Sequence, residues 1–433
     1  MKLKRLTLAL IVASLGFSAT AQQTQSLRLT LAEAQQYAVE HNATMCNADL
    51  DVKKAELERW KTLSSMLPTV KASFDYQNML GYKMEMHMGG QSVAIPLNPS
   101  GSFSVTAAVA VTGAQIVGVM LQDIAQEMTD ITRQQTEQTT RSQVKSVYVS
   151  ILVMEQTIGL LDSSLANIER LAAVSQAAVN VGAAEQVDAD KLQVQAATLR
   201  SSINTSNRSL QMLRNSLLLQ LGADVNATVE LTTPVEAILN VGDAAQLLGE
   251  AFHPENNYTY RLLEQNERLA EKNVTMAWMD FTPTLSAYYQ YSAKTYFGED
   301  EGMNMTPPNM VGLAISLPII TTGTRYANVK SSKIALQETQ NSRRQAEDGL
   351  QVQYNQLRYD LTSALETYDI QRNNLDVTQR VFYNITEKYK YGRASSLEVT
   401  TASNDIIAAQ NQYLQAAMNI ITAQTALENL LNK

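Results

Sequence analysis

Histidine and cysteine, two residue types that commonly carry out bond chemistry, are scarce in this chain of 433 residues. It contains three histidines, His41, His87 and His253, and a single cysteine, Cys46. Their positions match no metal-ligand spacing, and the sequence has no nucleophile elbow or phosphate-binding loop. We therefore expect that the protein is not an enzyme, that it needs no cofactor, and that its lone cysteine forms no disulfide within the chain.

One segment with metal-binding potential is rich in methionine. Residues 84–88 read Met-Glu-Met-His-Met, and further methionines in or near a second expected loop are Met303, Met305 and Met310. Thioether and imidazole groups are suitable ligands for Cu(I). The chain contains 17 methionines, however, and loops tolerate this composition without a metal. We therefore assign no residue as a metal ligand. Whether residues 84–88 bind a metal cannot be read from the sequence.

A duplicated heptad stripe predicts the helices on which any functional residue would lie. The first copy steps by four and three residues through Val147, Ile151, Met154, Ile158, Leu161, Leu165, Ile168, Ala172, Ser175 and Val179. The second lies 357 − 147 = 210 residues later, at Leu357, Leu361, Ala364, Tyr368, Gln371, Leu375, Thr378, Phe382, Ile385 and Tyr389. This spacing is typical of long helices that pack against other helices, and its repetition predicts two tandem structural units.

Proline placement permits these helices to be very long. Residues 100–233 and 319–433 contain no proline, and an interior proline would cost about 3 kcal/mol. One helix over 114–181 would extend roughly 100 Å at 1.5 Å per residue. We expect each long helix to turn back at a glycine, Gly182 or Gly392, into return helices over 185–221 and 396–431.

Four segments alternate between apolar and small or polar residues, which is typical of strands with one apolar face. They span residues 69–77, 102–111, 285–291 and 311–317. We expect helices before the first and third strands, at 30–66 and 258–280, and loops at 84–100 and 297–309.

The resulting organisation has four parts. Residues 1–21, with a basic start, a short apolar core and Ala19-Thr20-Ala21, read as a signal peptide. Residues 22–222 form a first repeat of helix, two strands and a long helical hairpin, and residues 258–433 form a second. A linker at 223–257 is expected to carry a short helix at 243–252.

Charge and hydropathy exclude two classes of protein. The net charge is −8, which becomes −8 − 3 = −11 without the three basic residues of the leader, and basic runs are missing. Nucleic-acid binding therefore has no electrostatic basis. After the leader we expect no run that is long and apolar enough for a transmembrane helix, which needs about 20 residues.

Four strands per chain cannot close into a barrel, and open sheet edges are not tolerated in lipid. Three chains would supply twelve strands, which can close. The apolar stripes and the tyrosines Tyr76, Tyr82, Tyr289 and Tyr291 would suit the outer surface and rims of such a barrel. A soluble sheet packed on the helices is the alternative.

At this point the mature sequence resembles the TolC family of outer-membrane efflux ducts. The resemblance rests on Leu29-Thr30-Leu31-Ala32-Glu33-Ala34, Leu67-Pro68-Thr69, Leu317-Pro318 with Thr322-Gly323, Val181-Gly182 with Val187-Asp188, and Tyr391-Gly392 with Leu397-Glu398. It implies a mostly α fold with a small transmembrane β part, and a trimer with a barrel in the outer membrane and a helical tunnel in the periplasm. It also implies docking to a periplasmic adaptor and an inner-membrane pump.

The resemblance implies a periplasmic constriction formed by residues near the two turns. Asp188 and Glu398, each six residues after the tip glycine, would form a negative ring that favours cations. Tyr389 and Arg393 would take part in the hydrogen bonds that hold the gate shut, although Arg393 lies one position earlier than the arginine of the family. The alternatives are that the two carboxylates only complement a helix dipole, that Tyr389 packs as part of the heptad stripe, and that Arg393 is merely solvated.

The small residues at the turns would be adaptor contacts in the same family, or they form tight turns without a partner. These hairpin-tip residues are Val181, Gly182, Ala183, Ala184, Tyr391, Gly392 and Ala394. The sequence thus predicts the exit duct of a tripartite efflux or type I secretion system, with a secreted coiled-coil tethering protein that has no pore as the alternative. The cargo, the adaptor and the resting state of the gate cannot be read from the sequence.

Overall fold

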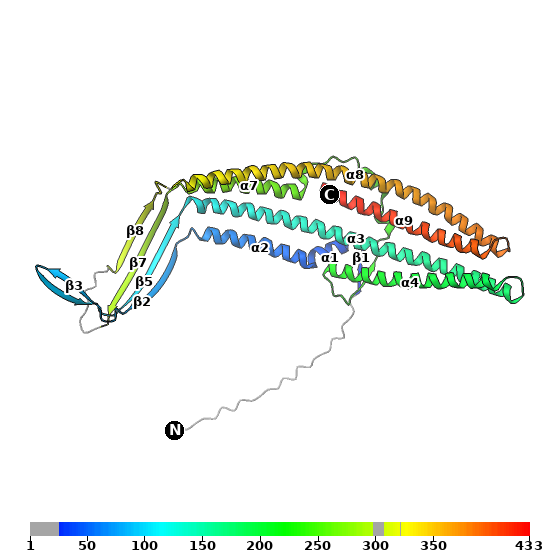
Figure 1. Ribbon diagram of the computed structural model, residues 1–433, viewed down its shortest axis with the longest axis horizontal. Coiled ribbons are helices and arrows are strands. Elements are labelled where there is room, and N and C mark those ends of the chain that lie inside the picture. Colours follow the sequence, from blue (N-terminus) through cyan, green and yellow to red (C-terminus); the bar gives the residue numbers. More distant parts are fainter. Residues whose placement is uncertain (1–25, 298–306, 321) are drawn as a thin grey trace, which may run out of the picture.

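The computed structural model describes residues 26–297, 307–320 and 322–433. Figure 1 shows an elongated, mostly helical molecule, with a small β-sheet at one end and two helical turns at the other. The expected signal peptide at 1–21 lies outside the described residues, as do Met303 and Met305.

Two long helical hairpins form the length of the molecule, as the heptad stripes predicted. In the first, α3 (Gly113–Asn180) turns back into α4 (Gln186–Leu221), and in the second, α8 (Thr324–Lys390) turns back into α9 (Ser396–Leu431). The stripe residues Ile151, Leu161 and Ile168 are buried in the first hairpin, and Leu361, Tyr368 and Phe382 in the second. The heptads therefore mark the faces on which the helices pack.

The sheet contains the four expected strands, with β2 at its expected bounds and the other three longer or shifted by a few residues. Its order is β2 (Thr69–Gln77), β5 (Ser100–Val111), β7 (Thr284–Tyr296) and β8 (Asn309–Ser316), all antiparallel. The register places Val70, Ala107, Tyr289 and Val311 in one row across the sheet. The four apolar stripes consequently share one face, as side chains alternate along each strand.

The apolar face of the sheet is uncovered in the described chain. Leu313 is 78% exposed, and the other large apolar residues exposed on this face include Val70, Phe74, Phe103, Leu285, Tyr289, Val311 and Ile315. A contiguous apolar surface of this kind marks a membrane or protein contact.

The helices that continue the strands keep the order of the sheet. Alpha-helix α2 (Ala43–Ser64) packs on α3, α3 packs on α7 (Tyr258–Met279), and α7 packs on α8. Figure 1 shows these four helices running side by side away from the sheet. The layer therefore has open edges at β2 and α2 on one side and at β8 and α8 on the other.

Three sequence predictions need correction. The helix expected at 30–66 is two helices, α1 (Leu31–His41) and α2, because Asn42 adopts an extended conformation and caps α2 through its side chain. The loop expected at 84–100 contains a hairpin of β3 (Lys83–Met88) and β4 (Gln91–Pro96). The short helix expected at 243–252 is α6 (Val241–Leu247), preceded by α5 (Val235–Ile238) and followed by the 3-10 turn Pro254–Asn256.

A parallel pair of short strands was not predicted from the sequence. Strand β1 (Ser26–Leu29) pairs in parallel with β6 (Thr228–Leu231), which joins the start of the described chain to the linker. The fully buried Tyr148 of α3 fixes this pair, since its hydroxyl donates to Leu29 O at 3.1 Å and accepts from Thr233 N at 3.0 Å.

The expectation that no segment after the leader is long and apolar enough to cross a membrane is wrong for helix α3. By length and composition this helix contains such a stretch. The same helix packs along α2, α4, α7 and α9 within the helical part of the molecule. Its apolar character is thus explained by the partners on several of its sides.

Candidate functional site

The residues proposed from the sequence converge at the two helical turns, at the end of the molecule opposite the sheet (Figure 1). At each turn the glycine has a left-handed backbone, with φ of 75° at Gly182 and 66° at Gly392. The next residue closes the turn, because Ala183 N donates to Ala178 O and Arg393 N donates to Lys388 O, both at 2.8 Å. Glycine is favoured at this position since it has no Cβ.

The surface of the turns is formed by apolar and small side chains. Val181 is 79% exposed and Tyr391 is 76% exposed. Ala183 is exposed as well, while Ala184 and Ala394 are half-buried. The two tips thus offer uncovered apolar surface next to backbone that cannot move without breaking the turn bonds.

Glu398 lies in the first turn of α9 and is exposed. Its carboxylate accepts hydrogen bonds from Ser395 N at 2.7 Å and Ser395 Oγ at 2.9 Å, while Glu398 N donates back to Ser395 Oγ at 3.2 Å. This reciprocal capping box stabilises the start of the helix. The hydrogen bonds from Ser395, chiefly from its backbone, lower the pKa of Glu398 below its usual 4.5.

Asp188 has a different partner, and that partner belongs to the other hairpin. Its carboxylate accepts a hydrogen bond from Ser396 Oγ, and Ser396 is buried at the start of α9. Two turns further along, Gln195 Nε2 of α4 donates to Asn404 Oδ1 of α9 at 2.8 Å. These bonds tie the two hairpins of one chain together just behind their tips.

Tyr389 and Arg393 take no part in this link. Tyr389 is half-buried and packs with the cluster that contains Leu161, Ile168 and Val399. Arg393 is exposed, and within the described residues no hydrogen bond or ion pair connects the side chain of either residue to Asp188. In the single chain the link that holds Asp188 is therefore made by Ser396.

Ser396 was not predicted from the sequence. The motif Ser395-Ser396-Leu397-Glu398 does carry a readable signal, because serine three residues before glutamate is typical of a capping box. That signal identifies Ser395 and Glu398 but not the bond from Ser396 to Asp188. The latter depends on how α4 and α9 lie against each other.

The methionine-rich segment forms β3 rather than a loop. Met84, Met86 and Met88 occupy alternate positions along this strand, and Glu85 and His87 occupy the positions between them. Met310 lies on β8, opposite Gln290. Among the described residues no group of three or more His, Cys, Asp or Glu side chains gathers for a metal ion.

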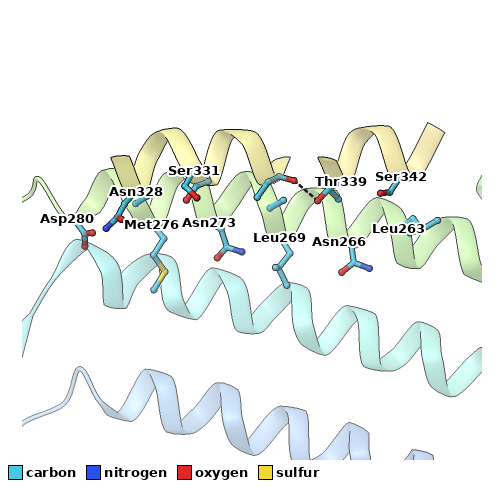
Figure 2. Close-up of a pocket in the computed structure, with 14 residues that line it drawn as sticks. Leu263, Asn266, Leu269, Asn273, Met276, Asp280, Asn328, Ser331, Thr339 and Ser342 are labelled. Atoms are coloured by element: carbon cyan, nitrogen blue, oxygen red, sulfur yellow. Dashed lines mark hydrogen bonds between the residues drawn. The ribbon is translucent and has the colours of Figure 1, made fainter. Parts of the chain in front are cut away.

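A long groove between α7 and α8 has a volume of about 780 Å³. Figure 2 shows Asn266 and Asn273 of α7 and Asn328, Ser331 and Thr339 of α8 along it. Asp280 is the only ionisable side chain among the lining residues. Amide and hydroxyl groups without an acid–base pair suit contact with water or another chain better than bond chemistry.

Comparisons with known proteins agree with this architecture. The sequence model of the outer membrane efflux protein family matches residues 255–433. The outer membrane efflux protein BepC of Brucella suis biovar 1 (strain 1330) is 21% identical over 299 residues, which cover 68% of this chain and 63% of BepC. The chain thus spans less than two thirds of that curated relative.

Solved structures with the same fold include the outer membrane protein VceC of Vibrio cholerae, with a TM-score of 0.73 and 14% identity over 93% of this chain and 95% of VceC. The MtrE outer membrane channel of Neisseria gonorrhoeae, solved in its open state, has a TM-score of 0.72 and 18% identity over 93% of this chain and 88% of MtrE. Residues 255–433 therefore match the outer membrane efflux protein family, and the described chain as a whole shares the fold of VceC and MtrE.

Proposed function

We propose that this protein is a homotrimeric exit duct in the outer membrane, through which a periplasm-spanning efflux or type I secretion system releases its substrates. The observation that carries the proposal is the four-stranded sheet, with one exposed apolar face and two open edges. Lipid tolerates such a sheet only when its edges are paired. The family match of residues 255–433 supports the same role.

The coincidence of the open edges favours closure by copies of the same chain. The strands β2 and β8 are the free edges of the sheet, and their continuations α2 and α8 are the free edges of the helical layer. A rotation that pairs β8 of one chain with β2 of the next would also bring α8 beside α2. Three chains would supply twelve strands and twelve helices in one closed wall.

In this assembly the two tandem units, residues 22–222 and 258–433, would each contribute two strands and a long helical hairpin. The sheet would lie in the outer membrane, and the hairpins would extend into the periplasm with their tips towards an adaptor and an inner-membrane pump. Val181, Gly182, Ala183, Ala184, Tyr391, Gly392 and Ala394 would form the adaptor contact. The exposed apolar tips support this role.

The test is to extract the protein from outer membranes in detergent, measure its native mass and add it to planar bilayers. A trimer that produces discrete conductance steps is the expected result. A monomer that is soluble without detergent and conducts nothing would contradict the duct and favour the tethering protein.

Glu398 is expected to contribute to cation selectivity at the periplasmic constriction. Glu398→Gln removes the charge, yet glutamine can also close a capping box, so the helix start is retained. We expect the permeability ratio of cations to anions to fall severalfold in single-channel recordings, whereas Glu338→Gln, an exposed change on α8, leaves it unchanged. An unaltered ratio in Glu398→Gln would remove Glu398 from the constriction.

This contribution should also depend on pH in a defined direction. The pKa of Glu398 lies below 4.5 because Ser395 donates to the carboxylate. The charge therefore persists when the pH falls to the usual carboxyl value, and it is lost only at lower pH, as the pH passes through the folded-state pKa.

Ser396 is expected to hold the gate in the state described here. Ser396→Ala removes the hydrogen bond to Asp188 that links the two hairpins. If this bond is made only in the closed gate, its loss removes about 1.5–3 kcal/mol from that state, and the open probability should rise roughly tenfold or more. Single-channel recording measures this rise.

The matched control is Ser202→Ala, since among the described residues the Ser202 hydroxyl bonds only to Thr198 O of its own helix, at 3.1 Å. It should leave the open probability unchanged. Equal behaviour of the two variants would show that the Asp188–Ser396 link does not restrain the gate.

A further inference from the structure

The junction between the sheet and the helices carries a second exposed surface that the duct function does not use. We call it the junction belt, and it consists of the exposed Trp278, Phe281, Leu317, Ile319, Ile320 and Lys333 and the half-buried Arg325. In Figure 1 it lies where β8 leads into α8 and α7 leads into β7. Ile319 and Ile320 are 88% and 89% exposed, although both are large apolar residues.

Each aromatic ring of the junction belt has a cation over it. The Arg325 guanidinium lies 5.9 Å from the centre of the Phe281 ring, and Lys333 Nζ lies 5.9 Å from the centre of the Trp278 ring. The two rings are themselves 5.5 Å apart. Arg325 is further positioned by a hydrogen bond of 3.4 Å from Nη1 to Pro318 O.

The local charge is opposite to that of the whole chain. Residues 317–335 contain Arg325, Lys330 and Lys333 and no acidic residue, whereas the chain has 42 acidic and 34 basic residues. Asp280, at the end of α7, is the acid closest in sequence to the two rings. Within the described residues none of these three cations forms an ion pair.

The order of these groups along the molecule is that of a membrane surface. The apolar face of the sheet comes first, then the exposed isoleucines, then the Phe281–Arg325 pair, and one helical turn or more beyond it the Trp278–Lys333 pair. Aromatic rings favour the level of lipid headgroups, and long basic side chains extend their charge toward phosphate.

We propose that the junction belt binds the phosphate groups of anionic phospholipids in the leaflet that faces the helical part of the protein. Ile319 and Ile320 enter the acyl region, and Arg325 and Lys333 hold the headgroup phosphate beside the Phe281 and Trp278 rings. The inference rests on the proposed membrane location of the sheet. It adds a preference for anionic lipid at one face of each chain.

Trp278 provides a probe of this contact, because Trp60 is the only other tryptophan. The experiment uses the full-length Trp60→Phe protein reconstituted into phosphatidylcholine vesicles that contain a minority of phosphatidylglycerol. Bromine, which quenches tryptophan fluorescence, is carried on the acyl chains of one lipid or of the other. We expect brominated phosphatidylglycerol to quench Trp278 more strongly at equal bilayer fraction, with about fivefold local enrichment for each cation engaged.

Arg325→Gln with Lys333→Gln should abolish the preference while quenching by brominated phosphatidylcholine persists. Lys333→Gln alone leaves the Arg325 bond to Pro318 O intact and should reduce the preference by about fivefold. The control Arg170→Gln with Lys191→Gln changes two exposed cations of the tip-side helices and should leave the preference unchanged.

The outcomes separate this inference from the proposed function. Equal quenching by the two brominated lipids would overturn the preference for anionic phospholipid and leave the membrane location standing. Absence of quenching in protein that floats with the vesicles would mean that another chain covers the belt, which also overturns the inference. Protein that fails to associate with vesicles would contradict the proposed function itself.

Discussion

Leu313→Arg is expected to prevent assembly of the protein in the outer membrane. Leu313 lies in the middle of β8, on the apolar face of the sheet, and is one of its most exposed residues. If this face contacts lipid, an arginine there costs about 2–4 kcal/mol at the bilayer midplane, once for each chain of the assembly. The amount of trimer in the outer-membrane fraction, measured on unheated gels, should fall to a small part of the unmodified level.

The neighbouring position supplies a matched control. Ala314 is exposed too, but it lies on the opposite face of the same strand, in register with Ser286. Ala314→Arg introduces the same charge and should assemble normally, since the polar face would line an aqueous interior. If both variants assemble equally well, the apolar face does not contact lipid and the soluble-sheet alternative gains support.

The long elements were readable from the sequence because each depends on local pattern alone. The heptad stripe through Ile151, Leu161 and Ile168 defines one packed face of α3, and the absence of proline lets that helix continue for 68 residues. Likewise, the alternation in residues 69–77 matches β2 at both ends. Repetition of these patterns in the second half strengthened each prediction.

The β3–β4 hairpin was not predicted, although its sequence carries a local signal for a hairpin. Residues 83–88 alternate charged or polar with methionine, and Gly89-Gly90 follows as a two-residue turn before β4. A glycine pair between two alternating runs is typical of a hairpin. Because the methionines suggested metal ligands in a loop, this segment was not predicted to form strands.

The remaining features depend on contacts between distant segments, which local pattern does not encode. The parallel pair of β1 and β6 joins residues about 200 positions apart, and the Asp188–Ser396 bond joins the two hairpins. The candidate gate was thus located by its turns and its acidic residues. Its hydrogen-bond partner emerged only from the placement of α4 against α9.

The break between α1 and α2 at Asn42 also depends on a contact between distant segments. Asn42 Nδ2 donates to Gln220 O at 2.7 Å, so the end of α4 is fastened to the break. Gly222 closes α4 in a left-handed conformation with φ of 71°, and a Cβ added there would lie 2.2 Å from His41 O. Backbone carbonyls cannot rotate away as a flexible side chain can.

Gly222→Ala is therefore expected to be strongly destabilising. The left-handed backbone costs about 1–2 kcal/mol for a residue with a Cβ, and the forced displacement of α1 adds about 1–3 kcal/mol. Gly349→Ala makes the same chemical change inside α8, where a Cβ meets no atom within 4 Å, and should instead stabilise the helix by about 0.5–1 kcal/mol. Thermal unfolding followed by circular dichroism should move the two midpoints in opposite directions. Shifts of the same sign would mean that the α1–α4 contact yields without loss, and that the hairpin end is not anchored at the Asn42 break.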